Sequence, residues 1–163
     1  MKRIVESHIR NFIFGVEDSL VSTVALLSGV ATAGMARSDI VLTGVILVFV
    51  EAFSMAIGSF LSERSSEEFA THHDGPERPM IVDALIMFGS YFVSGFIPIA
   101  PYMLVSLNRA TVVSIGVSLV ALLTLGSVSA HWSHMPVLHG GLRMGILGGA
   151  AIALGVAVGS FFN

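Results

Sequence analysis

Five long runs of mostly apolar residues dominate this chain of 163 residues. A helix needs about 20 consecutive apolar residues to cross the hydrocarbon core of a bilayer. The runs have that length, and they predict membrane-spanning helices at about 12–34, 40–62, 81–104, 111–131 and 142–162. Only 12% of the residues are charged, whereas soluble domains contain about a quarter. We therefore predict an all-α, polytopic membrane protein in which residues 1–163 form a single domain of five transmembrane helices.

The composition also excludes several classes of function. The net charge is −3 and no basic stripe runs along the chain, so nucleic acid is not an expected partner. The chain has no Cys, which excludes a disulfide framework and a thiolate metal site. Its His residues fall near the ends of the spans, and no Ser/His or His-Glu-x-x-His arrangement occurs at membrane depth. We therefore do not expect an enzyme.

The positions of Lys and Arg predict the orientation of the spans, because cytoplasmic loops are enriched in these residues. One side of the membrane receives six of the eight basic residues, namely Lys2, Arg3, Arg10, Arg64, Arg78 and Arg143; the other receives Arg37 and Arg109. The N-terminus is thus expected in the cytoplasm and Asn163 outside. The longest polar connection, residues 63–80, becomes a cytoplasmic loop, and its first part up to Thr71 could continue the second span as an acidic helix.

Two carboxylates and a thioether are expected at similar depth in the first two spans. Asp18 and Met55 each lie about 7 residues from the cytoplasmic end of their span, or roughly 10 Å deep, and Glu51 lies one helical turn deeper. Asp18 begins a stripe of small and polar residues with Ser22, and Glu51 begins a similar stripe with Met55. Small residues allow helices to approach closely. We expect the two stripes to face each other.

A carboxylate in hydrocarbon costs about 3 kcal/mol or more unless it meets a partner, water or an ion. We expect no Lys or Arg inside the five spans, so an ion pair is not the expected partner of Asp18 and Glu51. Carboxylate oxygens suit many divalent cations, and a thioether adds a preference for softer transition metals. Glu17 points about 100° away from Asp18 on the helix. It could join this site or sit near the lipid headgroups.

The cytoplasmic rim supplies further candidate metal ligands. Glu63 and Glu67 are spaced i, i+4 and share a helix face, and His72 and His73 follow in the same loop. Imidazole suits Fe²⁺, Mn²⁺ and Zn²⁺. Asp83, at the start of the third span, is expected either to cap that helix or to join the rim, with capping favoured. The glycine-rich fifth span contains two GxxxG pairs, which we expect to pack inside the bundle.

Three stretches resemble the vacuolar iron transporter family, the iron and manganese exporters of yeast, plant and prokaryotic membranes. GVEDSLVSTVALLSGVATAG (15–34) is similar to the first-span motif of the family, with Asp18 at its acidic position. EAFSMAIGSFLSERSSEEF (51–69) resembles the second-span segment, with Ser54, Met55 and Gly58 on its motif. IPIAPYML (97–104) resembles the Pro-rich third span. The chain is similar to a short form, because the large cytoplasmic metal-binding domain of the family is reduced here to the 63–80 loop.

The resemblance implies a homodimer with an ion path between the first two helices of each protomer. It also implies exchange of metal for protons, with protomers meeting near Gly15, Ser19 and Ser22. We expect an integral protein of a prokaryotic cytoplasmic membrane, surrounded by lipid, that exports Fe²⁺ or Mn²⁺ as its substrate and holds no permanent cofactor. Asp18, Glu51 and Met55 would bind the metal, and Ser22, Ser54 and Gly58 would line the path. The alternative is a relative that does not transport and serves as a membrane scaffold or metal sensor.

Overall fold

A computed structural model of the protein describes residues 2–71 and 77–163. These residues form five helices and no strand: α1 (Lys2–Thr32), α2 (Arg37–Thr71), α3 (Glu77–Leu104), α4 (Leu107–Trp132) and α5 (Val137–Ser160). Each helix is long and apolar enough to cross a membrane. The all-α fold with five candidate membrane spans is therefore confirmed.

The helices are longer than the apolar runs that predicted them. α1 begins at Lys2 rather than near residue 12, and α2 continues past residue 62 to Thr71, as its acidic end suggested. α3 begins at Glu77, so most of the expected 63–80 loop is helical. The expected ligands His72 and His73 lie outside the described residues. Apolar runs mark only the part of a helix inside the hydrocarbon, whereas Glu, Lys and Arg favour helix just as well outside it.

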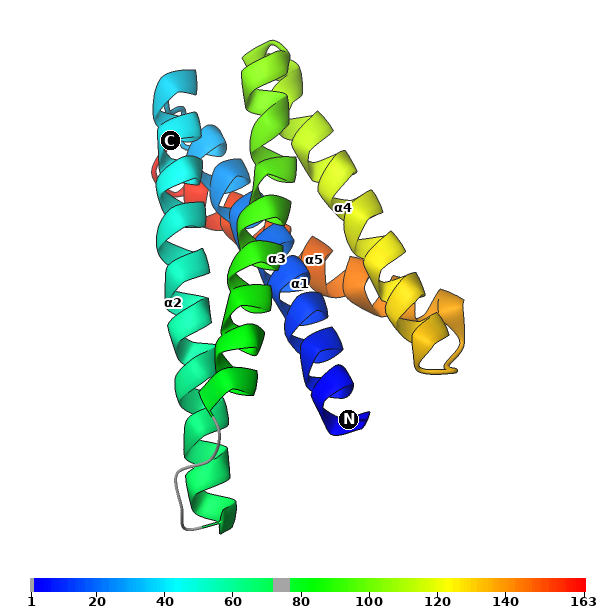
Figure 1. The fold of residues 1–163 in the computed structure, drawn as a ribbon. Helices are drawn as coiled ribbons and strands as arrows, with labels where there is room; N and C mark the ends of the chain where they lie inside the picture. The colour runs from blue at the N-terminus through cyan, green and yellow to red at the C-terminus, as the bar shows by residue number, and fades with distance from the viewer. Residues whose placement is uncertain (1, 72–76) are drawn as a thin grey trace.

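Successive helices run in opposite directions, which gives the bundle two distinct ends (Figure 1). The N-terminus, the end of α2, the start of α3 and the α4–α5 turn lie at what we call the inner end. The α1–α2 turn, the α3–α4 turn and the C-terminus lie at the outer end. Gly34 has φ +80° in the α1–α2 turn, a conformation that favours glycine and ends α1.

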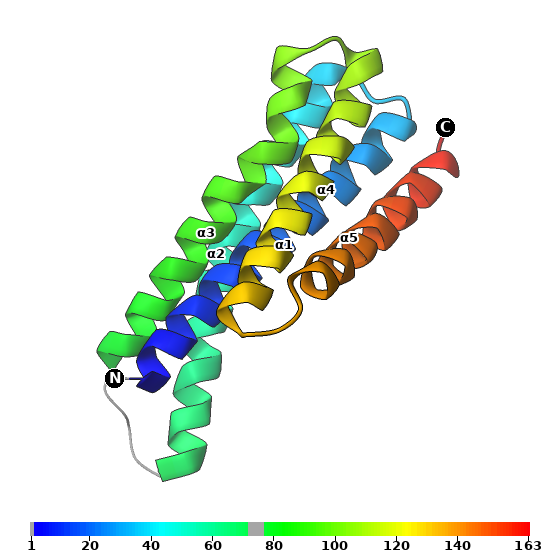
Figure 2. The ribbon, with the colours of Figure 1, turned by 90° about the vertical axis from the view of Figure 1, so that its right-hand side faces the viewer.

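α1 lies at the centre of the bundle and packs against all four other helices. α3 covers one side of α1 and also contacts α2 and α4, whereas α5 packs against α1 and α4. Figure 2 shows α5 on the opposite side of α1 from α2 and α3. α2 packs chiefly on α1 and α3, so much of its surface is uncovered within the protomer.

Glycines bring α5 into backbone contact with α1. A Cβ placed on Gly29 would lie only 2.7 Å from the carbonyl oxygen of Gly155, and one on Gly155 or Gly159 would collide with the backbone of Ala25 or Gly29. Without side chains at these positions the two helices can approach closely. The prediction that the GxxxG pairs of the fifth span pack inside the bundle is confirmed.

The apolar core lies in the outer half of the bundle. Leu27, Ile40, Val48, Ile99 and Tyr102 are fully buried in one cluster contributed by α1, α2 and α3. Buried polar side chains occur in both halves: Asn11, Asp83 and Ser90 lie towards the inner end, and Thr23, Ser28, Ser114 and Ser118 towards the outer end. The apolar cluster closes the outer end between α1, α2 and α3.

Candidate functional site

The two carboxylates predicted at membrane depth come together where α1, α2 and α3 meet. Asp18 on α1 and Glu51 on α2 are both half-buried and close enough to interact electrostatically. Tyr91 of α3 is fully buried and lies within electrostatic range of both carboxylates. Its hydroxyl forms a hydrogen bond of 2.8 Å with the hydroxyl of Ser22. The site thus combines two acidic groups with two hydroxyls, all of which offer oxygen to a cation.

An open groove of about 770 Å³ leads from the inner end towards this site. α2 lines it with Ser54, Met55, Gly58, Ser59, Ser62, Glu63 and Ser66; α1 adds Arg10, Asn11 and Phe14, and α3 adds Met87. Phe14 lies one helical turn from Asp18 towards the inner end, and Met55 lies one turn from Glu51 in the same direction. The groove therefore ends about one turn short of the carboxylate pair. The predicted residues Ser54, Met55, Gly58 and Glu63 therefore share one groove.

The small residues of α2 keep this groove open instead of allowing close helix packing. Ser54 and Gly58 are exposed, and a Cβ placed on Gly58 would meet nothing within 4 Å. Asp18 and Glu51 lie near each other as expected, whereas the α2 residues nearer the inner end line the open groove instead of packing closely on α1. The α1 stripe does make close contacts, but it makes them with other helices, such as α3 through Ser22 and α5 through Gly29.

Ion pairs and hydrogen bonds join three helices at the inner mouth of the groove. Glu63 of α2 pairs with Arg10 of α1 and also accepts a hydrogen bond of 3.4 Å from Ser7. Ser7 has a single hydroxyl proton, which is shared between Glu63 and, at 2.8 Å, Asp83 of α3. The Asp83 carboxylate also contacts His8 Nδ1 at 2.7 Å. Asp83 is buried within α3 and contacts side chains of α1, so it joins the rim and does not cap its own helix.

The predicted rim ligands do not gather into a metal cluster in the part of the chain that the structure describes. No group of three or more His, Asp or Glu side chains is placed to hold a metal ion there. Glu67 lies further out on the α2 extension and is partly exposed. Glu63 already has Arg10 as its partner. Among the described residues, the Asp18–Glu51 pair with nearby Met55 remains the best candidate for binding a cation.

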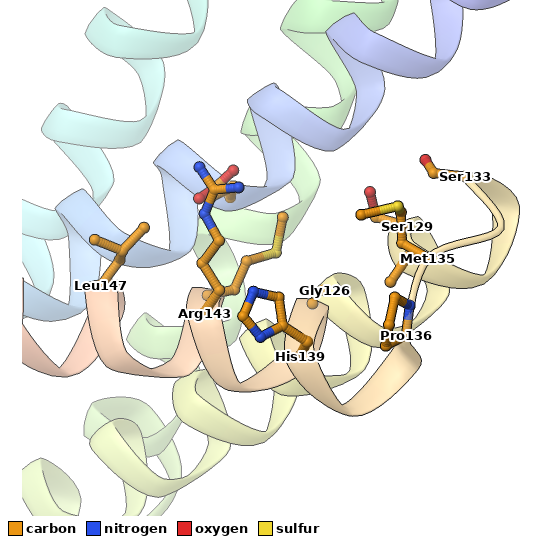
Figure 3. Close-up of a pocket in the computed structure, with 12 residues that line it drawn as sticks. Gly126, Ser129, Ser133, Met135, Pro136, His139, Arg143 and Leu147 are labelled. Carbon is orange, nitrogen blue, oxygen red and sulfur yellow. The ribbon is translucent and has the colours of Figure 1, made fainter.

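Glu17 faces away from that pair, towards a pocket of about 330 Å³ between α1, the end of α4 and the start of α5. Arg143 lines the same pocket and interacts electrostatically with Glu17. Figure 3 shows Arg143 extending from α5 towards α1, with His139 one turn before it on the same side of α5. The expectation that no basic residue lies inside a span is wrong, because α5 begins at Val137 and contains Arg143.

Two residues of this region were missed by the sequence reasoning, and each left a signal. Tyr91 stands in the apolar third span between Ser90 and Ser94, and these serines mark a polar face. Arg143 is the only Asp, Glu, Lys or Arg residue of α5, and it follows His139 at i+4. Isolated polar groups in apolar helices usually mark a functional face. Applied to every span, that rule would have identified both residues.

Comparison with known proteins shows the family of this chain. The chain matches the model of the VIT family over residues 9–81 and 67–160, two parts that meet at the connection between α2 and α3. It is similar to vacuolar iron transporter 1 of Oryza sativa subsp. japonica, with 25% identity covering 89% of this chain and 81% of the rice protein. The vacuolar iron transporter of Centaurea cyanus is 24% identical, covering 93% and 87%, and vacuolar iron transporter 1 of Arabidopsis thaliana is 22% identical, covering 89% and 82%. The chain belongs to the VIT family.

Proposed function

We propose that this protein transports a divalent transition metal, Fe²⁺ or Mn²⁺, across the membrane and exports it from the cytoplasm in exchange for protons. The observation that carries the proposal is the Asp18–Glu51 pair beyond the deep end of a groove that opens at the inner end of the bundle. Two carboxylates in a low-dielectric region repel each other and are costly unless a cation or protons neutralise them. The names of the similar plant proteins support iron as a substrate.

The same two carboxylates provide a chemical reason for exchange. A carboxylate must be deprotonated to bind a metal, so binding a metal releases protons and protonation releases the metal. Met55 lies one turn from Glu51 and would add a thioether, which favours a softer transition metal such as Fe²⁺ over Mg²⁺ or Ca²⁺. The hydroxyls of Ser22 and Tyr91 could complete the oxygen ligands. In this proposal Ser54 and Gly58 line the approach, and Glu63 and Glu67 attract cations to the mouth.

In this proposal the structure would be one stage of transport. The groove is open at the inner end, while the core cluster of Leu27, Ile40, Val48 and Ile99 closes the outer end. A carrier must expose its site to each side in turn, so a second state would separate these outer helix ends and close the groove. The Arg10–Glu63 ion pair joins α1 to α2 across the groove mouth, where that closure would occur.

The test is transport by purified protein in liposomes, with Fe²⁺ or Mn²⁺ followed inside and a pH dye following proton movement. If metal enters in exchange for protons that leave, metal uptake should increase when the liposome interior is more acidic than the outside. Asp18→Asn and Glu51→Gln keep the size of each side chain but remove its charge, and both should reduce uptake to background. Asp39→Asn, exposed at the outer start of α2, is the matched control and should transport normally. Full transport by Asp18→Asn, or no divalent metal carried by the wild type, would contradict the proposal.

A further inference from the structure

The site on α1 is flanked by a charge pair that the proposed transport does not use. Glu17 lies about 100° around α1 from Asp18, away from the groove. It lines the pocket that α1 shares with α5. Arg143 lines the same pocket and extends towards α1 (Figure 3). Glu17 is within electrostatic range of both Arg143 and Asp18. A charge on α5 can therefore affect the ion site across the width of α1.

The charges around the site balance only when Arg143 is counted. Asp18 interacts electrostatically with Glu51 and also with its neighbour Glu17, and the three acidic groups together would exceed the charge of a divalent cation. We propose that Arg143 is a specificity-determining residue, whose positive charge cancels that of Glu17 and leaves the ion site with the two negative charges of Asp18 and Glu51. This assignment rests on the proposed function and gives α5 a part in it.

Other polar groups near Glu17 do not provide this balance. His139, Ser129 and Ser133 also line the pocket, but the hydroxyls carry no charge, and the basic residue that interacts electrostatically with Glu17 is Arg143. Arg143 is the only Lys or Arg residue that lines the pocket. Because Arg143 is exposed and Glu17 is half-buried, removing one member of the pair should change cation binding by roughly two- to fivefold.

The assignment predicts opposite effects for the two single substitutions. Arg143→Gln leaves Glu17 uncompensated, so Mn²⁺ should bind more tightly and leave more slowly, lowering both the apparent KM and the maximal rate. Glu17→Gln leaves Arg143 uncompensated, so Mn²⁺ should bind more weakly and the apparent KM should rise. The double variant restores the charge balance and should return the KM to near the wild-type value. Arg143→Lys keeps the charge and should behave like the wild type.

The experiment measures Mn²⁺ binding to the purified proteins by electron paramagnetic resonance, and Mn²⁺ uptake into liposomes. Arg109→Gln removes the same charge from an exposed position at the outer start of α4 and serves as the matched control. If both single variants weaken binding and the double variant shows no rescue, Arg143 only supports the local fold and the assignment is wrong. If the wild type transports Mn²⁺ and all variants match it, the assignment fails while the proposed function stands. A wild type that carries neither Mn²⁺ nor Fe²⁺ would overturn both.

Discussion

Glu17 and Asp18 are consecutive residues, yet they lie in different surroundings because an α-helix turns about 100° per residue. Asp18 faces Glu51 and Tyr91 at the end of the groove, and Glu17 faces Arg143 in the pocket beside α5. One acidic group therefore has a basic partner, whereas the other lies beside a second acid. The cation that neutralises Asp18 and Glu51 must then come from outside the protein, as either a metal ion or protons.

Met55 provides a residue-scale prediction about metal choice. Met55→Leu keeps nearly the same volume, so the fold should be retained, with a stability change under about 1.5 kcal/mol. It removes the one soft ligand next to Glu51, so competition assays should show transport shifting from Fe²⁺ towards harder ions such as Mg²⁺. Leu61, an exposed apolar residue of α2, provides a control: Leu61→Met should leave the preference unchanged. An unchanged preference in Met55→Leu would remove Met55 from the site.

Sequence alone predicted that Asp18 and Glu51 lie close together, because a carboxylate in an apolar span is conspicuous and helical spacing gives its depth and face. Their role as metal ligands stays a prediction. That reasoning paired Asp18 with Glu51 and placed Met55 one turn away. It could not predict which helix covers each face of α1, since that depends on contacts between segments distant in sequence. The contacts of Ser22 with Tyr91 and of Glu17 with Arg143 are of that kind.

At the scale of helices, the apolar pattern predicted how many there are but not where they end. Apolar runs report the bilayer, and α1, α2 and α3 all continue into polar sequence at the inner end. Contacts between helices explain how the end of α3 is satisfied, which the apolar pattern left open. Arg37, the first residue of α2, donates hydrogen bonds to the carbonyl oxygens of Tyr102 and Met103 at the end of α3. It thereby satisfies carbonyl groups that have no partner within their own helix.

The glycines of α5 give a prediction at the same scale. Gly155→Ala places a methyl group against the backbone of Ala25, which cannot move without separating α5 from α1, so stability should fall by about 1–3 kcal/mol. Gly149 is the matched control, because a Cβ there meets nothing within 4 Å. Gly149→Ala should be neutral or stabilising, since Ala favours helix by about 1 kcal/mol over Gly. Thermal unfolding in detergent measures both, and equal effects would contradict the packing described for α5.

For the whole molecule, the orientation in the membrane follows from charge and remains a prediction. Six of the eight Lys and Arg residues belong to the inner end, so that end should face the cytoplasm. A periplasmic reporter such as alkaline phosphatase, fused after Asn163, should be active, and the same reporter inserted after Thr71 should be inactive. The reverse pattern would turn the groove to the outside and make uptake, rather than export, the direction to test.

Assembly is the other question at this scale, and the uncovered groove bears on it. Ser54, Gly58 and Ser62 are exposed along α2 at or near membrane depth, next to the half-buried Glu51. Lipid tails cannot satisfy such groups. By contrast, the Gly15–Ser19–Ser22 stripe expected at the dimer contact already packs on α3: Ser19 donates a hydrogen bond of 2.7 Å to the carbonyl oxygen of Tyr91. A second protomer would thus be placed against the groove side of α2.

Crosslinking can distinguish these two faces, because the chain contains no Cys of its own. Ser54→Cys or Ser62→Cys should give disulfide or bis-maleimide crosslinks between protomers in membranes, whereas Ser22→Cys, bonded to Tyr91 within the protomer, should give few. Ile146→Cys, which is 62% exposed on α5, tests for random collisions. Crosslinks at Ser22 but not at Ser54 would return the contact to α1. Crosslinks at Ser54 alone would place the α2 helices of two protomers in contact, with one ion groove on each side. Movement of the two α2 helices against each other could then close both grooves at once.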